Sequence, residues 1–421
     1  MSRIEYKNSG IFWQPFIPKS WHVTRLKYIL KKLSREKGAD DELLVCSNSG
    51  DIKKRGDSRL GLVANSNDIY QGVRSGDLLI HGMDTWHGAI AVSKFDGMCT
   101  PVVHVCDSSQ NKEYVATYLR NMASQQIFKL ISNGVRQNTS DFRSWDKLSR
   151  IPIPLPPLVE QEKIVSYLED KTSKIDEVIL AKEKQIKLLQ ELKDAEIANV
   201  ITRGLNPDVK MKDSGIPWVG QIPEHWHIRQ LSQIAYEHFI SNKNVHHQNL
   251  LSLSYGQIIR KDINTTEGLL PASFDSYQIV ENGNVVLRLT DLQNDQKSLR
   301  VGLVKEEGII TSAYLCIGVL NNSILPAYLY NILHSYDIKK LFYSMGGGLR
   351  QNLNWPGLKK IDIPLPPPDE QQEIIAYIES KNNKIKALIS DLEAEIAYLK
   401  EYKQKLIADC VTGQINVQCE Q

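Results

Sequence analysis

The sequence lacks the features that mark several large classes of protein. Its six cysteines form no CxxC pair and no regular frame, which excludes a zinc ribbon or a disulfide scaffold and favours reduced thiols. No apolar run approaches the roughly 20 residues that a membrane helix needs. The polar start, MSRIEYKNSG, predicts no secretory leader. We therefore expect a cytoplasmic protein that makes no use of a membrane.

Motifs for catalysis and cofactor binding are also missing. The run Gly346–Gly348 is not followed by Lys-Ser or Lys-Thr, so it is no phosphate-binding loop of the Walker type. We find no glycine-rich S-adenosylmethionine loop, no Asn/Asp-Pro-Pro-aromatic motif and no Gly-x-Ser-x-Gly motif. His225, His227, His246 and His247 have no cysteine or carboxylate cluster at metal-ligand spacing beside them. We expect a chain that is not an enzyme and has no metal site.

The charge of the chain is unevenly distributed, although the total is only +2. Residues 1–150 carry 22 Lys and Arg against 15 Asp and Glu, and residues 207–360 carry 15 against 13. The acidic segments are 151–206, with 8 against 10, and 361–421, with 6 against 11. Basic segments set apart in this way are typical of a protein that meets a polyanion with part of its surface. Long solvated helices rich in glutamate would explain the acidic half equally well.

The chain is a tandem repeat, and at 421 residues it is long enough for two or three domains. IPIPLPPLVEQEKIVSYLE, which begins at residue 151, returns as IDIPLPPPDEQQEIIAYIE at residue 361. The ungapped match runs on to Asn206 and Asn416, with 24 identities in 56 positions. SGIFWQPFIPKSWH, from residue 9, likewise returns as SGIPWVGQIPEHWH from residue 214. Two copies of one frame therefore carry middles that differ in length and sequence.

Each copy predicts a globular α+β module followed by a long helix. The modules are expected at 1–150 and 207–360, and the joints with their helices at 151–206 and 361–421. The proline-rich joints predict extended, polyproline-like chain. Helical stretches are expected at 113–131 and 326–345. Strand-like runs lie at Leu43–Cys46, Asp77–Ile80, Gly88–Val92 and Val102–Val105 in copy one, and at Leu250–Leu253, Asn284–Leu289, Leu299–Val304 and Ala313–Val319 in copy two.

The two long helices are expected at about 160–203 and 369–412. Apolar residues recur in both at spacings of three and four with charged residues between them, which is typical of a coiled-coil seam. Each copy has only one such helix, and a whole module separates the two, so we expect them to pair with each other in an antiparallel coiled coil. The expected seam residues are Ile164, Leu168, Ile175, Ile179, Ile186 and Leu189 in the first helix, and Ile374, Ile378, Ile385, Leu392, Ile396 and Leu399 in the second.

These blocks resemble the specificity subunit of type I restriction-modification systems. The resemblance rests on the doubled IPxPLPPxxEQxxI block that leads into a long helix, with a Gly-x-Arg-Gln-Asn segment before each copy, and it extends over essentially the whole chain. It implies two target recognition domains that bind a bipartite DNA sequence, one half each, across a gap set by the helices. It also implies docking of two methyltransferase subunits and two restriction subunits. Catalysis and the cofactors S-adenosylmethionine, ATP and Mg are then expected in those partners, with none in this chain.

Candidate DNA-binding residues are basic, amide and aromatic side chains of expected loops, since these side chains read bases and phosphates. For the repeated Arg-Gln-Asn segment the alternative is a structural cap on the next loop, and for the others it is a solvated loop residue. The candidates are Lys53, Lys54, Arg55, Arg59, His81, Trp86, Arg136, Gln137 and Asn138 in copy one, and Arg260, Lys261, Arg288, Asn294, Lys297, Arg350, Gln351 and Asn352 in copy two.

Two other functions remain open from the residues alone. A coiled-coil adaptor with two protein-binding modules and no DNA role would explain the repeat and the helices, but not the basic modules beside acidic helices. A fused modification enzyme is disfavoured by the missing cofactor motifs.

Overall fold

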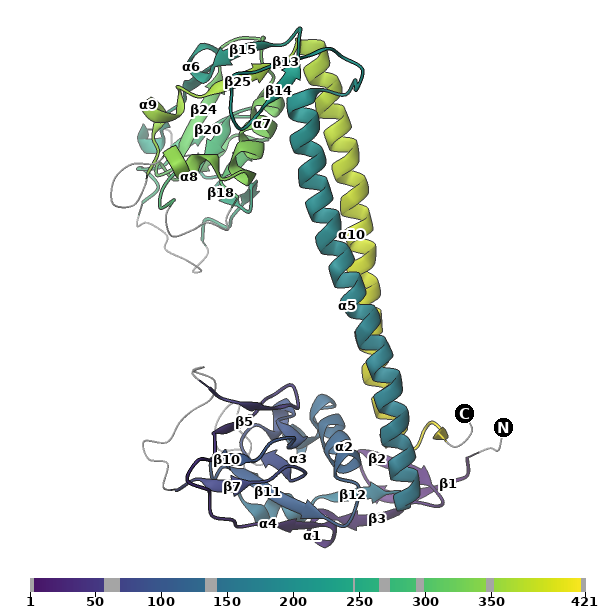
Figure 1. Ribbon diagram of the computed structural model, residues 1–421. Helices are drawn as coiled ribbons and strands as arrows, with labels where there is room; N and C mark the ends of the chain where they lie inside the picture. The colour runs from purple at the N-terminus through teal and green to yellow at the C-terminus, as the bar shows by residue number, and fades with distance from the viewer. Residues whose placement is uncertain are drawn as a thin grey trace. The chain divides into compact units, whose positions relative to one another are not determined.

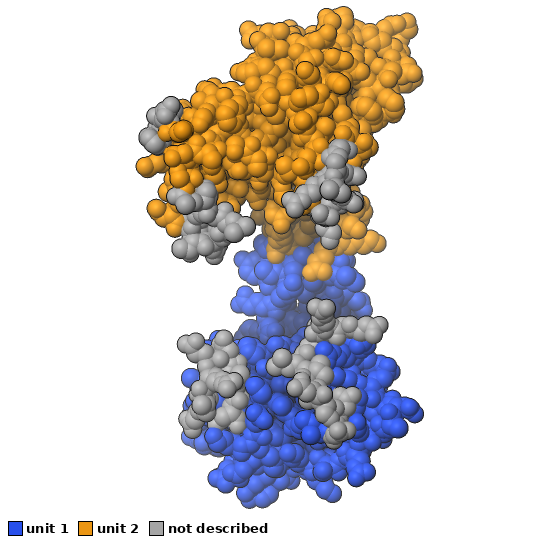
Figure 2. Space-filling view, turned by 90° about the vertical axis from the view of Figure 1, so that its left-hand side faces the viewer, with its two compact units in different colours: residues 1–182, 394–421 blue, residues 183–393 orange. Residues whose placement is uncertain are grey.

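The computed structural model describes residues 4–56, 69–132, 142–244, 247–264, 273–292, 299–345 and 352–417. The chain divides into two compact units (Figures 1 and 2). Unit 1 comprises Met1–Lys182 and Ala394–Gln421, and unit 2 comprises Glu183–Glu393. Each unit therefore contains one module together with a section of both long helices.

Unit 1 is an α+β module with a four-stranded antiparallel sheet in the order β4-β11-β8-β9. The hairpins β1-β2 and β5-β6 and the pairs β7-β10 and β3-β12 surround it. Its elements are β1 (Tyr6–Ile11), β2 (Gln14–Pro18), β3 (His22–Arg25), α1 (Leu26–Ile29), β4 (Leu30–Lys32), β5 (Leu44–Cys46), β6 (Ile52–Lys54), β7 (Gln71–Val73), β8 (Leu78–His81), the 3-10 helix η2 (Thr85–His87), β9 (Ile90–Val92), β10 (Gly97–Cys99), β11 (Val103–Ser108), α2 (Lys112–Ser124), α3 (Ile127–Ile131), α4 (Trp145–Ser149), β12 (Pro152–Leu155) and the first part of α5 (Leu158–Arg203).

Unit 2 repeats this plan with a four-stranded antiparallel sheet in the order β16-β24-β21-β22. A three-stranded sheet β17-β20-β23 and the pairs β13-β14, β15-β25 and β18-β19 complete it. Its elements are β13 (Met211–Asp213), β14 (Gln221–Pro223), β15 (His227–Gln230), α6 (Leu231–Ile234), β16 (Ala235–Glu237), β17 (Ile240–Ser241), the 3-10 helix η3 (Asn242–Asn244), β18 (Leu251–Ser254), β19 (Gln257–Arg260), β20 (Gln278–Val280), β21 (Val285–Leu287), β22 (Val301–Leu303), β23 (Gly308–Ile310), β24 (Leu315–Val319), α7 (Pro326–Ile338), α8 (Leu341–Met345), α9 (Trp355–Leu358), β25 (Asp362–Leu365) and the first part of α10 (Pro368–Val411).

The central sheet of each module is buried on both faces, which explains its apolar strands. Side chains alternate across a strand. In β8, Leu78 and Ile80 join the core under helix α2, whereas Leu79 joins a second core with residues of the hairpin β5-β6. In unit 2, Val285 and Val286 of β21 likewise belong to two different cores. Six of the eight β-like runs seen in the sequence are strands of these sheets and the other two are β5 and β18, so the α+β prediction is confirmed.

Each helical stretch expected in the modules is broken into two helices at a residue with a left-handed backbone. Gln126 (φ 57°) separates α2 from α3, and Lys340 (φ 59°) separates α7 from α8. Neither residue is a glycine, so the sequence carried no signal for the break. Helix α2 begins where the side chain of Asn111 accepts a hydrogen bond from the backbone N–H of Tyr114 at 3.0 Å, an ordinary N-cap.

The proline-rich joints are extended, as expected, and differ from a polyproline helix in that each is paired as a β-strand. Strand β12 pairs antiparallel with β3, and β25 pairs with β15. Proline is tolerated there because each strand lies in a two-stranded pair and therefore at an edge. Ile153 and Ile363, each followed by a proline, are fully buried, and their burial fixes these strands against the module.

The long helices α5 and α10 run side by side in opposite directions within each unit (Figure 1). In unit 1, Lys403 forms an ion pair with Asp176 at 2.7 Å, and Lys182 forms one with Glu395. As the residue numbers rise along α5, those of the ion-pair partners on α10 fall. The predicted antiparallel pairing is therefore confirmed. Among the expected seam residues in this unit, Ile164, Leu168, Ile179 and Ile396 are buried, and Ile175 and Leu399 are half-buried.

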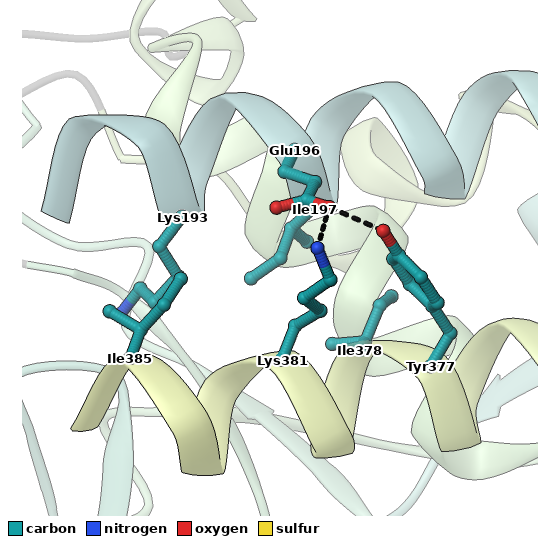
Figure 3. Close-up of a pocket in the computed structure, with 7 residues that line it drawn as sticks. All are labelled: Lys193, Glu196, Ile197, Tyr377, Ile378, Lys381 and Ile385. Atoms are coloured by element: carbon teal, nitrogen blue, oxygen red, sulfur yellow. Dashed lines mark hydrogen bonds and ion pairs between the residues drawn. The ribbon is translucent and has the colours of Figure 1, made fainter. Parts of the chain in front are cut away.

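The same pairing continues in unit 2. Lys381 of α10 forms an ion pair with Glu196 of α5 at 2.8 Å, and the Tyr377 hydroxyl donates a hydrogen bond to the same carboxylate (Figure 3). These two partners, Lys381 first, lower the pKa of Glu196. Among the expected seam residues in this unit, Ile374, Ile378 and Ile385 are buried, and Ile186, Leu189 and Leu392 are half-buried.

The last turn of each long helix completes the core of the module from the other copy. In unit 1, Val411 at the end of α10 is buried, and its carbonyl accepts a hydrogen bond from the Tyr114 hydroxyl at 3.2 Å. In unit 2, the Ile201 carbonyl near the end of α5 accepts one from Tyr328 at 3.1 Å. The final carbonyls of a helix have no partner within it, so a buried tyrosine supplies the missing donor. Gly204, the residue after α5, lies close to the Glu370 side chain, and a Cβ at this position would lie only 2.9 Å from it.

We predict that Tyr328→Phe destabilises unit 2 by about 1–3 kcal/mol, because the buried carbonyls of Ile201 and Pro364 would lose their common donor. Urea unfolding of the full chain measures this loss. Tyr330→Phe is the matched control, since its half-buried hydroxyl makes only a 3.4 Å contact with the Gly256 carbonyl. Equal losses for the two variants would contradict the helix-end role of Tyr328.

Candidate nucleic-acid interface

The hairpin β5-β6 of unit 1 presents two of the expected DNA-binding lysines on opposite faces. Leu44 and Ile52 anchor the hairpin in the core, while Lys53 and Lys54 are both exposed. Lys54 is ion-paired with Glu42. Lys53 has no ion pair with any residue that the structure describes. Lys53 is thus the better candidate for a phosphate contact.

His81 ends strand β8, and Trp86 lies in the 3-10 helix η2 that follows it. The His81 imidazole lies 3.2 Å from the Asp84 carboxylate, and its Nδ1 accepts a hydrogen bond from the Asp84 backbone N–H. Burial lowers the pKa of His81, which the nearby Asp84 partly offsets. Trp86 is half-buried against the core, and its indole N–H is buried with no hydrogen-bond partner among the described residues. His81 is thus held by the residues that follow it.

Trp86 also lines an open hollow of about 500 Å³ in unit 1, together with the turn at 48–51, helix α2 and Lys403 of α10. Arg120 lies in its wall and donates hydrogen bonds to the Ile90 carbonyl at 3.1 Å and to the Thr117 hydroxyl at 3.0 Å. Burial lowers the pKa of Arg120. No local pattern in the sequence singled out Arg120.

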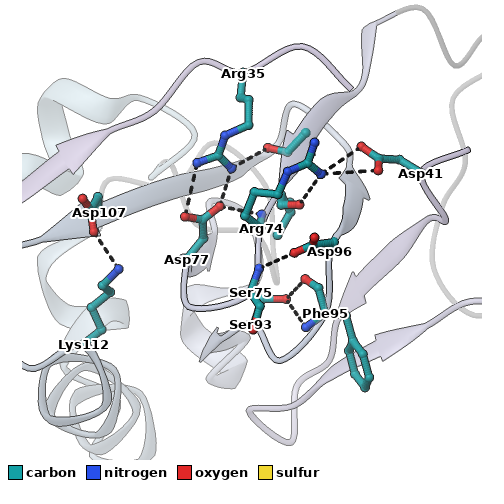
Figure 4. A network of polar contacts seen from close by, with 12 residues as sticks. Arg35, Asp41, Arg74, Ser75, Asp77, Ser93, Phe95, Asp96, Asp107 and Lys112 are labelled. Carbon is teal, nitrogen blue, oxygen red and sulfur yellow. Dashed lines mark hydrogen bonds and ion pairs between the residues drawn. The ribbon is translucent and has the colours of Figure 1, made fainter. Parts of the chain in front are cut away.

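Two further arginines of unit 1 belong to the structure of the module. Arg35 forms an ion pair with Asp77 at 2.5 Å, and Arg74 contacts Asp41 at 3.4 Å (Figure 4). The hydrogen bond to Asp77 raises the pKa of Arg35. These two arginines are therefore engaged inside the module, which composition alone does not reveal.

In unit 2 the corresponding hairpin β18-β19 ends at the expected residues Arg260 and Lys261. Arg260 is ion-paired with Glu306, which raises the pKa of the arginine and lowers that of the carboxyl group. Lys261 is exposed and has no ion pair within the described part of the chain. As in unit 1, one of two adjacent basic residues is neutralised and the other is not.

The loop after β21 holds the expected residue Arg288, which is half-buried, and lies beside Asn352. The Asn352 side chain accepts a hydrogen bond from the backbone N–H of Asp291 at 2.9 Å. Beneath the loop lies Arg300, which is fully buried and which the sequence did not single out. The structure therefore brings Arg288, Asn352 and a buried arginine together at one loop.

Several expected contacts lie outside the described residues, and Arg55 is half-buried next to one such stretch. All the DNA contacts named from the sequence remain predictions. The candidates outside the described residues are Arg59, Arg136, Gln137, Asn138, Asn294, Lys297, Arg350 and Gln351.

The described residues hold neither a metal-binding cluster nor a membrane-spanning helix. They contain no cluster of three or more His, Cys, Asp or Glu side chains that could hold a metal ion. None of their helices is long and apolar enough to span a bilayer.

Comparison with known proteins identifies the class. The family model for the type I restriction modification DNA specificity domain matches residues 88–190 and 282–398, which together are just over half of the chain. The type I restriction enzyme MjaVIII specificity subunit of Methanocaldococcus jannaschii is 24% identical over 422 residues, with 95% of this chain and 94% of that protein covered. The protein described as the MjaX specificity subunit of the same organism is 25% identical over 443 residues and covers 95% of each chain.

Solved structures show the same fold. A chain from a structural study of complex assembly and conformational transition in the type I R-M system has a TM-score of 0.68 at 16% identity, with 95% of this chain and 99% of that chain covered. The HsdS subunit from Thermoanaerobacter tengcongensis has a TM-score of 0.53 at 17% identity, with 95% and 98% covered. The chain is thus a tandem DNA-specificity protein. It belongs to the family of type I restriction-modification specificity subunits.

We predict that Lys53→Ala lowers the salt dependence of DNA binding by about one unit of slope in a plot of log affinity against log salt, because one phosphate contact would be lost. Filter binding of the full chain in its complex at several salt concentrations measures the slope. Lys54→Ala is the matched control: its charge is already neutralised by Glu42, so the slope should hardly change. A larger change for Lys54 than for Lys53 would refute the assignment.

Proposed function

We propose that this chain is the non-catalytic, sequence-reading subunit of a type I restriction-modification enzyme. Each module reads one half of a bipartite, asymmetric site in double-stranded DNA. Two methyltransferase subunits and two restriction subunits dock on the chain, and they bind S-adenosylmethionine, ATP and Mg. The observation that carries the proposal is one fold that occurs twice in the chain with different loops. Two modules of the same fold can bind DNA in the same way, and their different loops can recognise two different half-sites.

Contacts within each unit support independent reading by the modules. In unit 1 the buried Gln161 side chain accepts a hydrogen bond from the Asn111 backbone N–H at 3.0 Å and donates one to the Pro156 carbonyl at 2.9 Å. In unit 2 Gln371 makes the corresponding bonds to Leu325 at 2.8 Å and Pro366 at 2.9 Å. Each module is therefore bound to its helix by the same glutamine hydrogen bonds, although the loops of the two modules differ.

Exposed apolar side chains on the helices support the docking of partner subunits. In unit 1 they include Leu180 and Tyr398, which are 67% and 71% exposed, and in unit 2 they include Leu188, Leu192 and Leu388. Exposed apolar side chains mark protein–protein contact sites where they form a contiguous patch. We place the docking of methyltransferase subunits on these helices.

We predict that replacing residues 1–150 with the first module of another specificity subunit changes one half of the methylated motif and leaves the other half intact. The incoming module must supply a tryptophan and a tyrosine at the places of Trp21 and Tyr114, because these side chains bond to Glu160 and Val411. Sequencing of methylated bases in cells that express the chimera with its partner subunits measures both halves. The matched control is the reciprocal replacement of residues 207–360, which should change only the other half.

A simultaneous change of both halves by either chimera would contradict independent reading. A coiled-coil adaptor without a DNA role would leave the motif unchanged in both.

A further inference from the structure

Arg300 is a fully buried arginine in unit 2 whose hydrogen bonds converge on one loop. Its Nη1 donates to the carbonyls of Arg288 at 3.0 Å and Thr290 at 2.9 Å, and its Nη2 donates to the Asp291 carbonyl at 3.3 Å. Its Nε donates to the Tyr343 hydroxyl at 3.0 Å. A buried charge is costly unless it is fully hydrogen-bonded, and here most of the bonds go to the backbone of residues 288–291.

The same loop is also held by Asn352 and Leu353. The Asn352 side chain accepts a hydrogen bond from the Asp291 N–H at 2.9 Å, and the Leu353 N–H donates to the Leu289 carbonyl at 2.9 Å. Asp291 itself has a left-handed backbone, with φ of 55°, although it is not glycine. Aspartate adopts this conformation more readily than most residues, and the bonds that Asn352 and Arg300 make with the Asp291 backbone hold it there.

Unit 1 shows that the fold does not need an arginine at this place. The backbone bond from Arg288 to Arg300 in unit 2 corresponds to the bond from His81 to Ala89 in unit 1, so an alanine stands where unit 2 has the arginine. Polar side chains are buried elsewhere near the unit 1 loop, among them Thr85 and His104, whose Nε2 lies 2.7 Å from the Phe142 carbonyl. Arg300 is thus specific to unit 2 and is not part of the fold that the two modules share.

We propose that Arg300 and Asn352 are positioning residues that determine the sequence preference of unit 2. They hold residues 288–291 in one conformation, in which Arg288 is presented to the base pairs of one half-site. A loop that is ordered before binding loses less entropy on the DNA and accepts fewer wrong sequences. This inference rests on the proposed function.

The test uses cells that express the full chain with its methyltransferase partners, and the readout is the methylated motif together with the methylation rate at each degenerate sequence. Asn352→Ala removes only the acceptor for the Asp291 N–H from an exposed side chain. We expect discrimination to fall about tenfold at one or more positions of one half-site, with the other half-site unchanged. The melting temperature of the purified chain should hardly move.

Asn354→Ala is the matched control, because this exposed asparagine lies two residues further on and also accepts a backbone hydrogen bond, from Gly357. It caps α9 and does not touch the loop, so the motif should stay as in the wild type. Arg300→Lys is the second variant. It keeps the buried charge but replaces a planar fork of five donors by a single ammonium group, so the same half-site should relax as with Asn352→Ala.

The inference is overturned if Asn352→Ala and Arg300→Lys leave discrimination unchanged in both halves. It is also overturned if they weaken both halves equally while the melting temperature falls, which is the result for a purely structural role. Failure of the proposed function would look different, because the wild-type chain itself would then support no methylated motif.

Discussion

Neither copy of the repeat completes its own core, and this dependence organises the whole chain. Each module is closed by the last turn of the helix from the other copy: Cys410 and Val411 join the core of unit 1, and Val200 and Ile201 join the core of unit 2. The last carbonyls of a helix need donors from outside it, and buried tyrosines provide them at both sites. Both helices must therefore be present, and antiparallel, before either module is fully packed.

This dependence explains which parts of the chain repeat closely and which do not. The joints and helices carry the contacts that close both cores, so a change there affects two modules at once. Within the described residues, the variable middle of each copy contributes to the core of its own module alone. Their sheets share one strand order, yet the buried residue at one corresponding position is Ala89 in unit 1 and Arg300 in unit 2. A frame that accepts different buried groups at one place can present differently shaped loops to DNA.

Much of the fold could be predicted from the sequence, because its signals are local or periodic. Runs of β-branched and other apolar residues marked the central strands, and the spacing of apolar residues marked the long helices within two residues at each end. The joints were correctly expected to be extended, but the prolines gave no sign that they pair as edge strands with β3 and β15. The breaks at Gln126 and Lys340 had no glycine to announce them.

The candidate site was less predictable, because the availability of a charge depends on residues far away in the sequence. Lys54 and Arg260 look as suitable for DNA as their neighbours Lys53 and Lys261, but Glu42 and Glu306 neutralise them. Arg300 stands in an apolar run, where only the structure reveals that its bonds converge on one loop.

The central claim is that this chain supplies the sequence preference of a restriction-modification enzyme. It is tested most directly by mapping methylated adenines across the genome of cells with and without the chain, with the partner subunits present in both. The account predicts that deletion abolishes methylation at one bipartite, asymmetric motif and that the chain restores it. An unchanged methylation map after deletion would contradict the account.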